Sequence, residues 1–173
     1  RGMNLANGFL DEWLELRPHS PDHGMTYVLP YQYLADRADE IPLFRALLEK
    51  AWGSEADYAD KVLALQEAFG ATLMQVAPNY QRAFLPFGEA GSGKSTCVEI
   101  LKGLMPPNTY STIAPSDWKD KFLPAGLRGK LANFAGELSE SRFIAGDIFK
   151  QIVEGAEITA QHKNQKPFQF SPT

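Results

Sequence analysis

The stretch "FGEAGSGKST", residues 87–96, combines residue types that can hold a polyphosphate. Gly88 and Gly93 bracket four residues, and Lys94 and Ser95 follow directly, which fits the pattern G-x-x-x-x-G-K-[ST]. A glycine-rich turn that opens a helix can direct several backbone N–H groups at one anion. We expect Lys94 to reach the β- and γ-phosphates of ATP and the Ser95 hydroxyl to ligate Mg²⁺. The full set expected at the nucleotide is Gly88, Glu89, Ala90, Gly91, Ser92, Gly93, Lys94, Ser95 and Thr96.

A carboxylate at the end of an apolar run is the candidate for catalysis. Hydrolysis of ATP needs an acid near the phosphates, at the end of a neighbouring strand, to hold the magnesium shell and orient water. The segment "LANFAGE", residues 131–137, is apolar and ends at Glu137. We therefore expect Glu137 to serve the metal and the attacking water, together with Lys94 as the second catalytic residue. The alternative is a surface charge or a carboxylate near a helix start. A second adjacent acid is missing, and Glu140 is the next candidate.

Positive charge gathers near the end of the chain. The segment "EITAQHKNQKPFQF", residues 157–170, has two strand-like runs around a polar turn with His162 and Lys163, and Lys166 follows. Mobile cations on a loop tip suit contact with the phosphates of single-stranded DNA. A solvated hairpin tip without a ligand explains the same residues equally well.

The elements around these residues predict an α/β architecture. A short apolar strand over residues 82–87 should precede the glycine loop, and a helix with Val98, Leu101 and Leu104 on one face should follow it. Strands are expected within residues 109–114 and 129–138, a short helix over 116–123 capped by Ser116, and a helix over 146–155. This alternation predicts a three-layer P-loop unit with a parallel sheet over residues 81–173.

Residues 1–80 are expected to form a separate strand and helical-hairpin region. Asn7-Gly8 suits a two-residue hairpin turn, and residues 25–31 read as a short strand. One helix should begin near Pro42 and stop at Gly53. A second should begin after Ser54, with Asp57 completing a capping box, and stop at Gly70.

Composition narrows the class of protein. The chain has 173 residues, a net charge of -4, and 44% hydrophobic residues, which is ordinary for a globular domain. The acidic balance argues against a protein that coats nucleic acid non-specifically, although the last third is basic. No apolar run could span a membrane, no signal peptide is visible, and the single cysteine fits a reducing compartment, so we expect a cytoplasmic location. The first residue is not Met, which suggests a piece of a longer protein.

Three segments together resemble a known family. "GEAGSGKST", "LRGKLANFAGEL" and "FKQIVEGAEITAQHKNQKPFQF" are similar, in this order, to superfamily 3 helicases of the phage and plasmid primase-helicase type, relatives of poxvirus primase-helicases. The region before the loop, from "NGFLDEW" to "LQEAFGATL", also resembles the region before the motor in that family. The glycine loop alone indicates only nucleotide binding. The stretch from Lys150 through Gly155 to Lys163 resembles the B′ motif that distinguishes the superfamily.

The resemblance implies a replicative, AAA+-like DNA helicase encoded by a phage, plasmid or prophage and acting in a bacterial host. It implies a homo-hexameric ring on single-stranded or forked DNA, with ATP and Mg²⁺ as cofactors. By position, Glu137 becomes the Walker B acid, Lys150 and Glu157 fall in the B′ motif, and His162, Lys163 and Lys166 lie on the pore hairpin. The family's sensor asparagine and arginine finger are expected beyond Thr173, so this segment alone is expected to bind ATP better than it hydrolyses it.

Two other functions remain open at this point. A small P-loop kinase would want an arginine-rich lid, and only Arg128 and Arg142 follow the loop. A nucleotide-regulated assembly or partition ATPase would share the loop but would have no use for the basic hairpin after Glu157.

Overall fold

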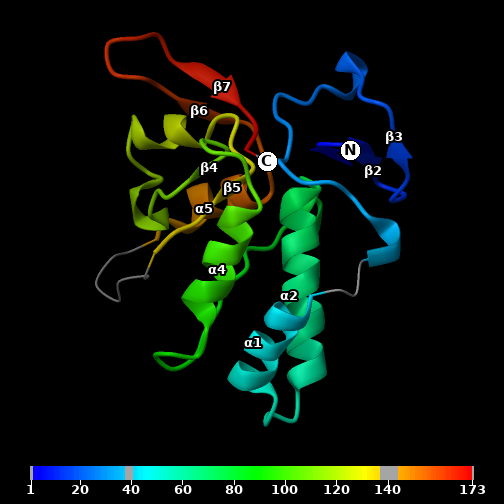
Figure 1. Cartoon of the computed structure of the whole chain (residues 1–173). Coiled ribbons are helices and arrows are strands. Elements are labelled where there is room, and N and C mark those ends of the chain that lie inside the picture. Colours follow the sequence, from blue (N-terminus) through cyan, green and yellow to red (C-terminus); the bar gives the residue numbers. More distant parts are fainter. Residues whose placement is uncertain (1, 38–40, 137–143, 173) are drawn as a thin grey trace. The chain divides into compact units, whose positions relative to one another are not determined.

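The computed structural model describes residues 2–37, 41–136 and 144–172 (Figure 1). The chain divides into two compact units. Unit 1 comprises Arg1–Met74 and Phe84–Pro106, and unit 2 comprises Gln75–Ala83 and Pro107–Thr173. The glycine loop thus groups with the N-terminal elements. The domain boundary at residues 80 and 81 stays a prediction.

Unit 1 begins with a small antiparallel sheet of order β1-β2-β3. Its strands are β1 (Gly2–Leu5), β2 (Gly8–Asp11) and β3 (Leu16–Arg17). Leu5 pairs with Gly8, so Ala6 and Asn7 form the turn, one residue earlier than predicted. Gly8 instead opens β2 with a φ of 151°, and a Cβ there would lie 2.6 Å from the carbonyl oxygen of Arg17. Glycine is needed at this position because the β3 backbone approaches so closely.

The predicted strand over residues 25–31 is wrong, because this segment makes only one isolated bridge, between Leu29 and Leu5. The Leu29 N–H donates to the Asn4 carbonyl at 2.7 Å, and Pro30, which has no N–H, cannot extend a ladder. Leu29 is nevertheless fully buried with Leu5 and Leu10, and partly buried tyrosines surround them. The segment is therefore fixed by its apolar side chains more than by strand pairing.

Asp11 organises the turn between β2 and β3. Its Oδ1 accepts hydrogen bonds from the backbone N–H groups of Trp13 at 3.0 Å and Glu15 at 2.9 Å. Its Oδ2 accepts from Arg17 Nε at 2.5 Å. These bonds, above all the one from Arg17, hold the pKa of the Asp11 carboxyl below its usual value. The charged form of Asp11 therefore stabilises the folded state.

This arrangement predicts a pH-dependent stability. A carboxyl whose folded pKa is lowered contributes stability above its unfolded value of about 3.9, and that contribution disappears as the pH falls through the lower folded value. Asp11→Asn should therefore be less stable than wild type at neutral pH and should converge with it in strong acid. Urea unfolding across the acid range measures this, with Asp22→Asn as a control on an exposed acid. A constant difference between Asp11→Asn and wild type at all pH values would contradict the assignment.

The helical hairpin of unit 1 consists of α1 (Pro42–Trp52) and α2 (Tyr58–Leu73). Pro42 begins α1 as predicted. Ser54, however, does not cap α2, which starts after Asp57. Gly70 does not end it either, since Met74 N–H donates to the Gly70 carbonyl and the helix runs on to Leu73. A helical glycine costs only about 1 kcal/mol, so packing of the neighbouring turns can override it.

Helix α4 (Lys94–Gly103) completes unit 1, with Cys97 packed against Leu48 of α1 and Leu65 of α2. The predicted strand over residues 82–87 is wrong, because the structure gives this segment no regular secondary structure. Phe84, Leu85 and Phe87 are exposed instead of buried in a sheet. The physical reason is Pro86, because proline has no backbone N–H to donate a hydrogen bond to a neighbouring strand.

Unit 2 contains the parallel pairing expected of an α/β fold. After the short helix α3 (Ala77–Tyr80) come β4 (Tyr110–Ser111) and β5 (Ala132–Asn133), which pair in parallel. Asn133 extends this pair, since its Oδ1 accepts from Ser111 Oγ at 2.7 Å and from Ile113 N at 2.9 Å. With two strands in this sheet among the described residues, the larger three-layer parallel core stays a prediction.

The predicted helix over residues 116–123 is wrong. Its place is taken by 3-10 turns at Pro115–Asp117 and Leu123–Leu127, and Ser116 lies inside the first. Asp120 explains the break, because its carboxylate accepts from the N–H groups of Phe122 at 2.6 Å and Leu123 at 3.0 Å. A side chain that satisfies the local backbone in this way competes with helix formation.

The remaining elements of unit 2 are α5 (Gly146–Val153), β6 (Ile158–Ala160) and β7 (Phe168–Phe170). The predicted helix and antiparallel hairpin are both present (Figure 1). In the hairpin, Ile158 pairs with Phe170. The apolar face of α5 supplies Ile152 to a core shared with Trp118, Leu127 and Ile158. This core fixes the base of the hairpin.

Gly155 ends α5 in a Schellman motif. Its N–H donates to the Ile152 carbonyl at 3.1 Å, and Ala156 N–H donates to the Gln151 carbonyl at 2.9 Å. The φ of Gly155 is 66°, and a Cβ would lie 2.9 Å from Pro78 Cβ. Glycine therefore satisfies both the backbone and the packing here.

Gly155→Ala should lower the free energy of unfolding by about 1 kcal/mol or more, because alanine resists positive φ and would press on Pro78. Gly146→Ala is the matched control on the same helix, since a Cβ at Gly146 has no neighbour within 4 Å. Thermal and urea unfolding of the two variants measure the difference. Equal stability of the two variants would show that the Gly155 conformation is not required.

Candidate nucleotide and nucleic-acid sites

Three glycines give the loop a backbone conformation that other residues rarely adopt. Gly88, Gly91 and Gly93 have φ values of 152°, 80° and 84°, all in the region where side chains are disfavoured. Gly93 is the N-cap of α4 and offers no side chain to the first turn. The N–H groups of that first turn have no partner within the helix, so they suit an anionic ligand.

Lys94 lies folded over the loop. Its Nζ donates to the carbonyl oxygens of Gly88 at 2.8 Å and Glu89 at 2.6 Å, and to Ser92 Oγ at 3.2 Å. The ammonium group is thus held beside the same backbone that would surround the phosphates. A small rotation of a flexible side chain would exchange these neutral acceptors for charged phosphate oxygens, which bind an ammonium more strongly.

Helix α4 positions the loop through its buried face. Cys97 and Leu101 lie in unit 1 below the exposed Ser95 and Thr96. Burial raises the pKa of the Cys97 thiol, so this cysteine stays protonated and acts as a small apolar residue. The exposed side of the same turn leaves the Ser95 hydroxyl accessible to a hydrated metal.

The donor set at the loop fits a nucleotide with Mg²⁺ better than a bare metal. Among the described residues, no group of three or more His, Cys, Asp or Glu side chains could hold a metal ion. Mg²⁺ keeps several waters and is usually bound by one or two protein oxygens together with substrate phosphates. Ser95 can supply one such oxygen. Glu137, the predicted acid, and Glu140 lie outside the described residues.

The basic turn of the β6–β7 hairpin is closed by its own hydrogen bonds. Gln161 Nε2 donates to the Gln165 carbonyl at 2.7 Å, Gln165 N–H donates to the His162 carbonyl at 3.0 Å, and Asn164 has a φ of 63°. His162, Lys163 and Lys166 are exposed on this turn and its exit. Cationic side chains are thus displayed on a defined loop.

Aromatic side chains support the hairpin. The rings of His162 and Phe168 stack with centroids 5.2 Å apart, and the Arg128 guanidinium lies 4.8 Å from the centroid of the Phe168 ring. Arg128 was not among the residues expected to bind DNA. Its position in "LRGK" gives no local sign of this interaction, which depends on the fold of unit 2.

Lys150 lies on α5 and not on the hairpin turn. Its Nζ is 3.7 Å from a Glu154 carboxylate oxygen, one helical turn away, and the side chain is largely exposed. Such an exposed pair contributes little stability, so Lys150 could exchange this partner for a phosphate. Glu157 is exposed just before β6.

One family model matches both the glycine loop and the hairpin. Residues 87–173, about half of the chain, match DUF5906, described as a family of unknown function. The chain belongs to the DUF5906 family. The DUF5906 match begins one residue before the glycine loop and continues through β4, β5, α5 and the hairpin. No curated protein matches the chain.

In the part of this DUF5906 chain that the structure describes, no helix has the length and apolar character needed to cross a membrane.

Proposed function

We propose that this chain is the ATP-binding part of a DNA helicase motor of the superfamily 3 type. The observation that carries the proposal is the glycine loop, with three glycines at positive φ leading into α4 and Lys94 folded over it. That conformation supports binding of a nucleoside triphosphate, which is the energy source of such a motor.

At the loop, the backbone N–H groups of the first turn of α4 would bind the phosphates. Lys94 would neutralise their charge, and Ser95 would contribute one oxygen to the magnesium shell. Mg²⁺ supplies further neutralisation of the phosphate oxygens during transfer. The proposed role of Glu137, to orient the attacking water, rests on its position in the sequence.

The DNA component of the proposal rests on the hairpin and on the family resemblance. The exposed Lys163 and Lys166 can bind phosphates, and the His162–Phe168 stack gives the turn a firm base. In the ring that we propose, a homo-hexamer, each hairpin would touch the same single strand, and a neighbouring subunit would complete the ATP site.

ATP hydrolysis in the presence and absence of single-stranded DNA tests this function. We expect DNA to increase the rate at which the protein hydrolyses ATP and releases phosphate. If DNA has no effect and radiolabelled γ-phosphate instead appears on a small-molecule acceptor, the kinase is the correct function. If hydrolysis proceeds and neither DNA nor an acceptor matters, an assembly ATPase is the better description.

A further inference from the structure

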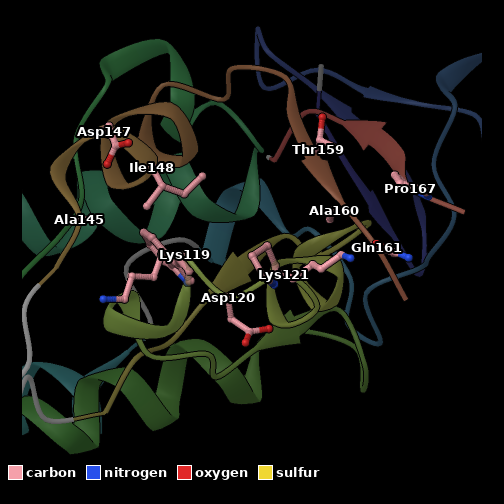
Figure 2. Close-up of a pocket in the computed structure, with 12 residues that line it drawn as sticks. Lys119, Asp120, Lys121, Ala145, Asp147, Ile148, Thr159, Ala160, Gln161 and Pro167 are labelled. Atoms are coloured by element: carbon pink, nitrogen blue, oxygen red, sulfur yellow. The ribbon is translucent and has the colours of Figure 1, made fainter. Parts of the chain in front are cut away.

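Unit 2 contains an open groove of about 450 Å³ beside the base of the hairpin. Figure 2 shows that its lining comes from three segments: residues 119–121, the start of α5, and the β6 strand with Pro167 opposite. Its size falls within the range of ligand sites, about 300 to 1,000 Å³. None of the residues expected to bind ATP or DNA lines it.

The walls of the groove are partly apolar. Ile148, Ala160 and Trp118 contribute to them, and the Trp118 ring stacks on Phe149 with centroids 5.6 Å apart. These side chains belong to or border the core of unit 2, so the walls are firm. A flat, weakly polar body could replace water against them favourably.

The polar lining carries both signs of charge. Lys119 and Lys121 are exposed at the groove, and Asp147 lies in the first turn of α5. Asp120 also lines it, and its Oδ1 accepts hydrogen bonds from two backbone N–H groups of its own turn. A ligand that uses the remaining groups needs an anion for the lysines and a hydrogen-bond donor for Asp147.

The side-chain amide of Gln161 can form hydrogen bonds with the edge of a base. Its amide nitrogen donates to the Gln165 carbonyl, and a primary amide has a second donor hydrogen and an acceptor oxygen besides. Thr159, two residues earlier on β6, adds a hydroxyl at the same wall. In Figure 2 the Asp147 side chain lies toward one side of the view and Gln161 toward the other, with Lys121 between them.

We propose that this groove binds one nucleotide unit whose base carries an exocyclic amino group, with its phosphate on Lys119 and Lys121 and its amino group on Asp147. Carboxylates accept hydrogen bonds from base amino groups, and thymine has none. The inference rests on the proposed DNA function, because β6 continues from the groove directly into the basic turn at His162 and Lys163. A strand that touches the turn can therefore place a neighbouring base in the groove.

Base binding in the groove would give the protein a sequence preference that the phosphate contacts of the hairpin turn do not give. Phosphate contacts position a strand, and base contacts specify it. The expected preference of wild type for poly-dA or poly-dC over poly-dT is about fivefold or more, the size of one good base contact.

The test measures fluorescence anisotropy of labelled homopolymers of about 16 nucleotides. The reference protein and every variant compared with it carry Lys94→Ala, so that the glycine loop does not bind the probe. Asp147→Asn should abolish the preference for poly-dA and poly-dC over poly-dT. The double variant Lys119→Ala with Lys121→Ala should lower the affinity for all three homopolymers by the same factor. Asp60→Asn is the matched control, since Asp60 is also an exposed acid in the first turn of a helix, α2.

The same variants titrated with dAMP, dCMP and dTMP separate a strand from a free nucleotide as the source. Binding of dAMP and dCMP that is lost in Asp147→Asn supports the groove with a free nucleotide as its ligand. Equal affinity of the Lys94→Ala reference protein for all homopolymers, or a preference that survives when Asp147→Asn is added, overturns the proposal. If the protein binds none of the homopolymers, while the protein with Lys94 unchanged still binds ATP, the groove proposal and the DNA part of the proposed function are both overturned. The ATP part of the proposed function then stands.

Discussion

Lys94→Ala is expected to weaken ATP binding by about one hundredfold, which an ordinary titration records as loss of binding. The ammonium group makes charge-assisted hydrogen bonds to phosphate, worth about 1.5 to 3 kcal/mol, and its removal leaves phosphate charge uncompensated. In the free protein the same group holds three loop oxygens, so the variant is also without the hydrogen bonds that close the loop.

Calorimetry or a fluorescent ATP analogue measures the affinity. Lys102→Ala is the matched control, because Lys102 lies on the same helix but pairs with Glu99 at 2.6 Å, away from the loop. Thermal unfolding of both variants checks that α4 remains folded. An ATP affinity of Lys94→Ala equal to that of wild type would show that the glycine loop is not the nucleotide site.

The second large effect concerns the hairpin. The double variant His162→Ala with Lys163→Ala should bind single-stranded DNA about tenfold more weakly, because it lacks one cation and the ring that stacks on Phe168. The dependence of affinity on salt should fall as well, by about 0.7 in the logarithmic slope for each phosphate that the protein no longer neutralises. Affinity for ATP should be unchanged.

Lys50→Ala provides the control for charge, since Lys50 is an exposed lysine in the last turn of α1. Anisotropy titrations at several salt concentrations measure both quantities. If the double variant and the Lys50 control bind DNA equally well, the hairpin is a solvated loop and has no role in DNA binding.

The sequence alone predicts two helices and one hairpin of this protein well, although the local helix expected over residues 116–123 is wrong. Lys94–Gly103 and Gly146–Val153 are helices because apolar residues recur at helical spacing, and both begin or end at glycines with a defined conformation. The β6–β7 hairpin follows from two short strand-like runs around a polar turn. These features depend on residues close to one another in the chain.

The strands that depend on distant partners could not be predicted in the same way. Residues 82–87 and 25–31 have apolar, strand-like sequences, yet the first has no strand conformation and the second makes a single bridge at Leu29. Strand propensity describes a fit to neighbours, and the sequence does not say whether those neighbours are present. Pro86 and Pro30 are the local features in these segments that disfavour strand pairing.

The side-chain hydrogen-bond networks could not be predicted from the sequence either. Asp11 reads as one acid among several in "LDEWLEL", but in the fold it accepts hydrogen bonds from two backbone groups and Arg17. The groove in unit 2 depends on Lys119, Asp147 and Gln161, which are far apart in the sequence. By contrast, the candidate residues of the glycine loop were predictable because they are contiguous.

Nucleotide recognition by the glycine loop is tested most directly by a competition experiment on the unmodified protein with Mg²⁺ present. Inorganic triphosphate should displace ATP from its tightest site, because the loop would recognise the phosphates and not the base. Adenosine should displace it poorly. Absence of ATP binding, or displacement by adenosine and not by triphosphate, would contradict a phosphate-binding role for the loop.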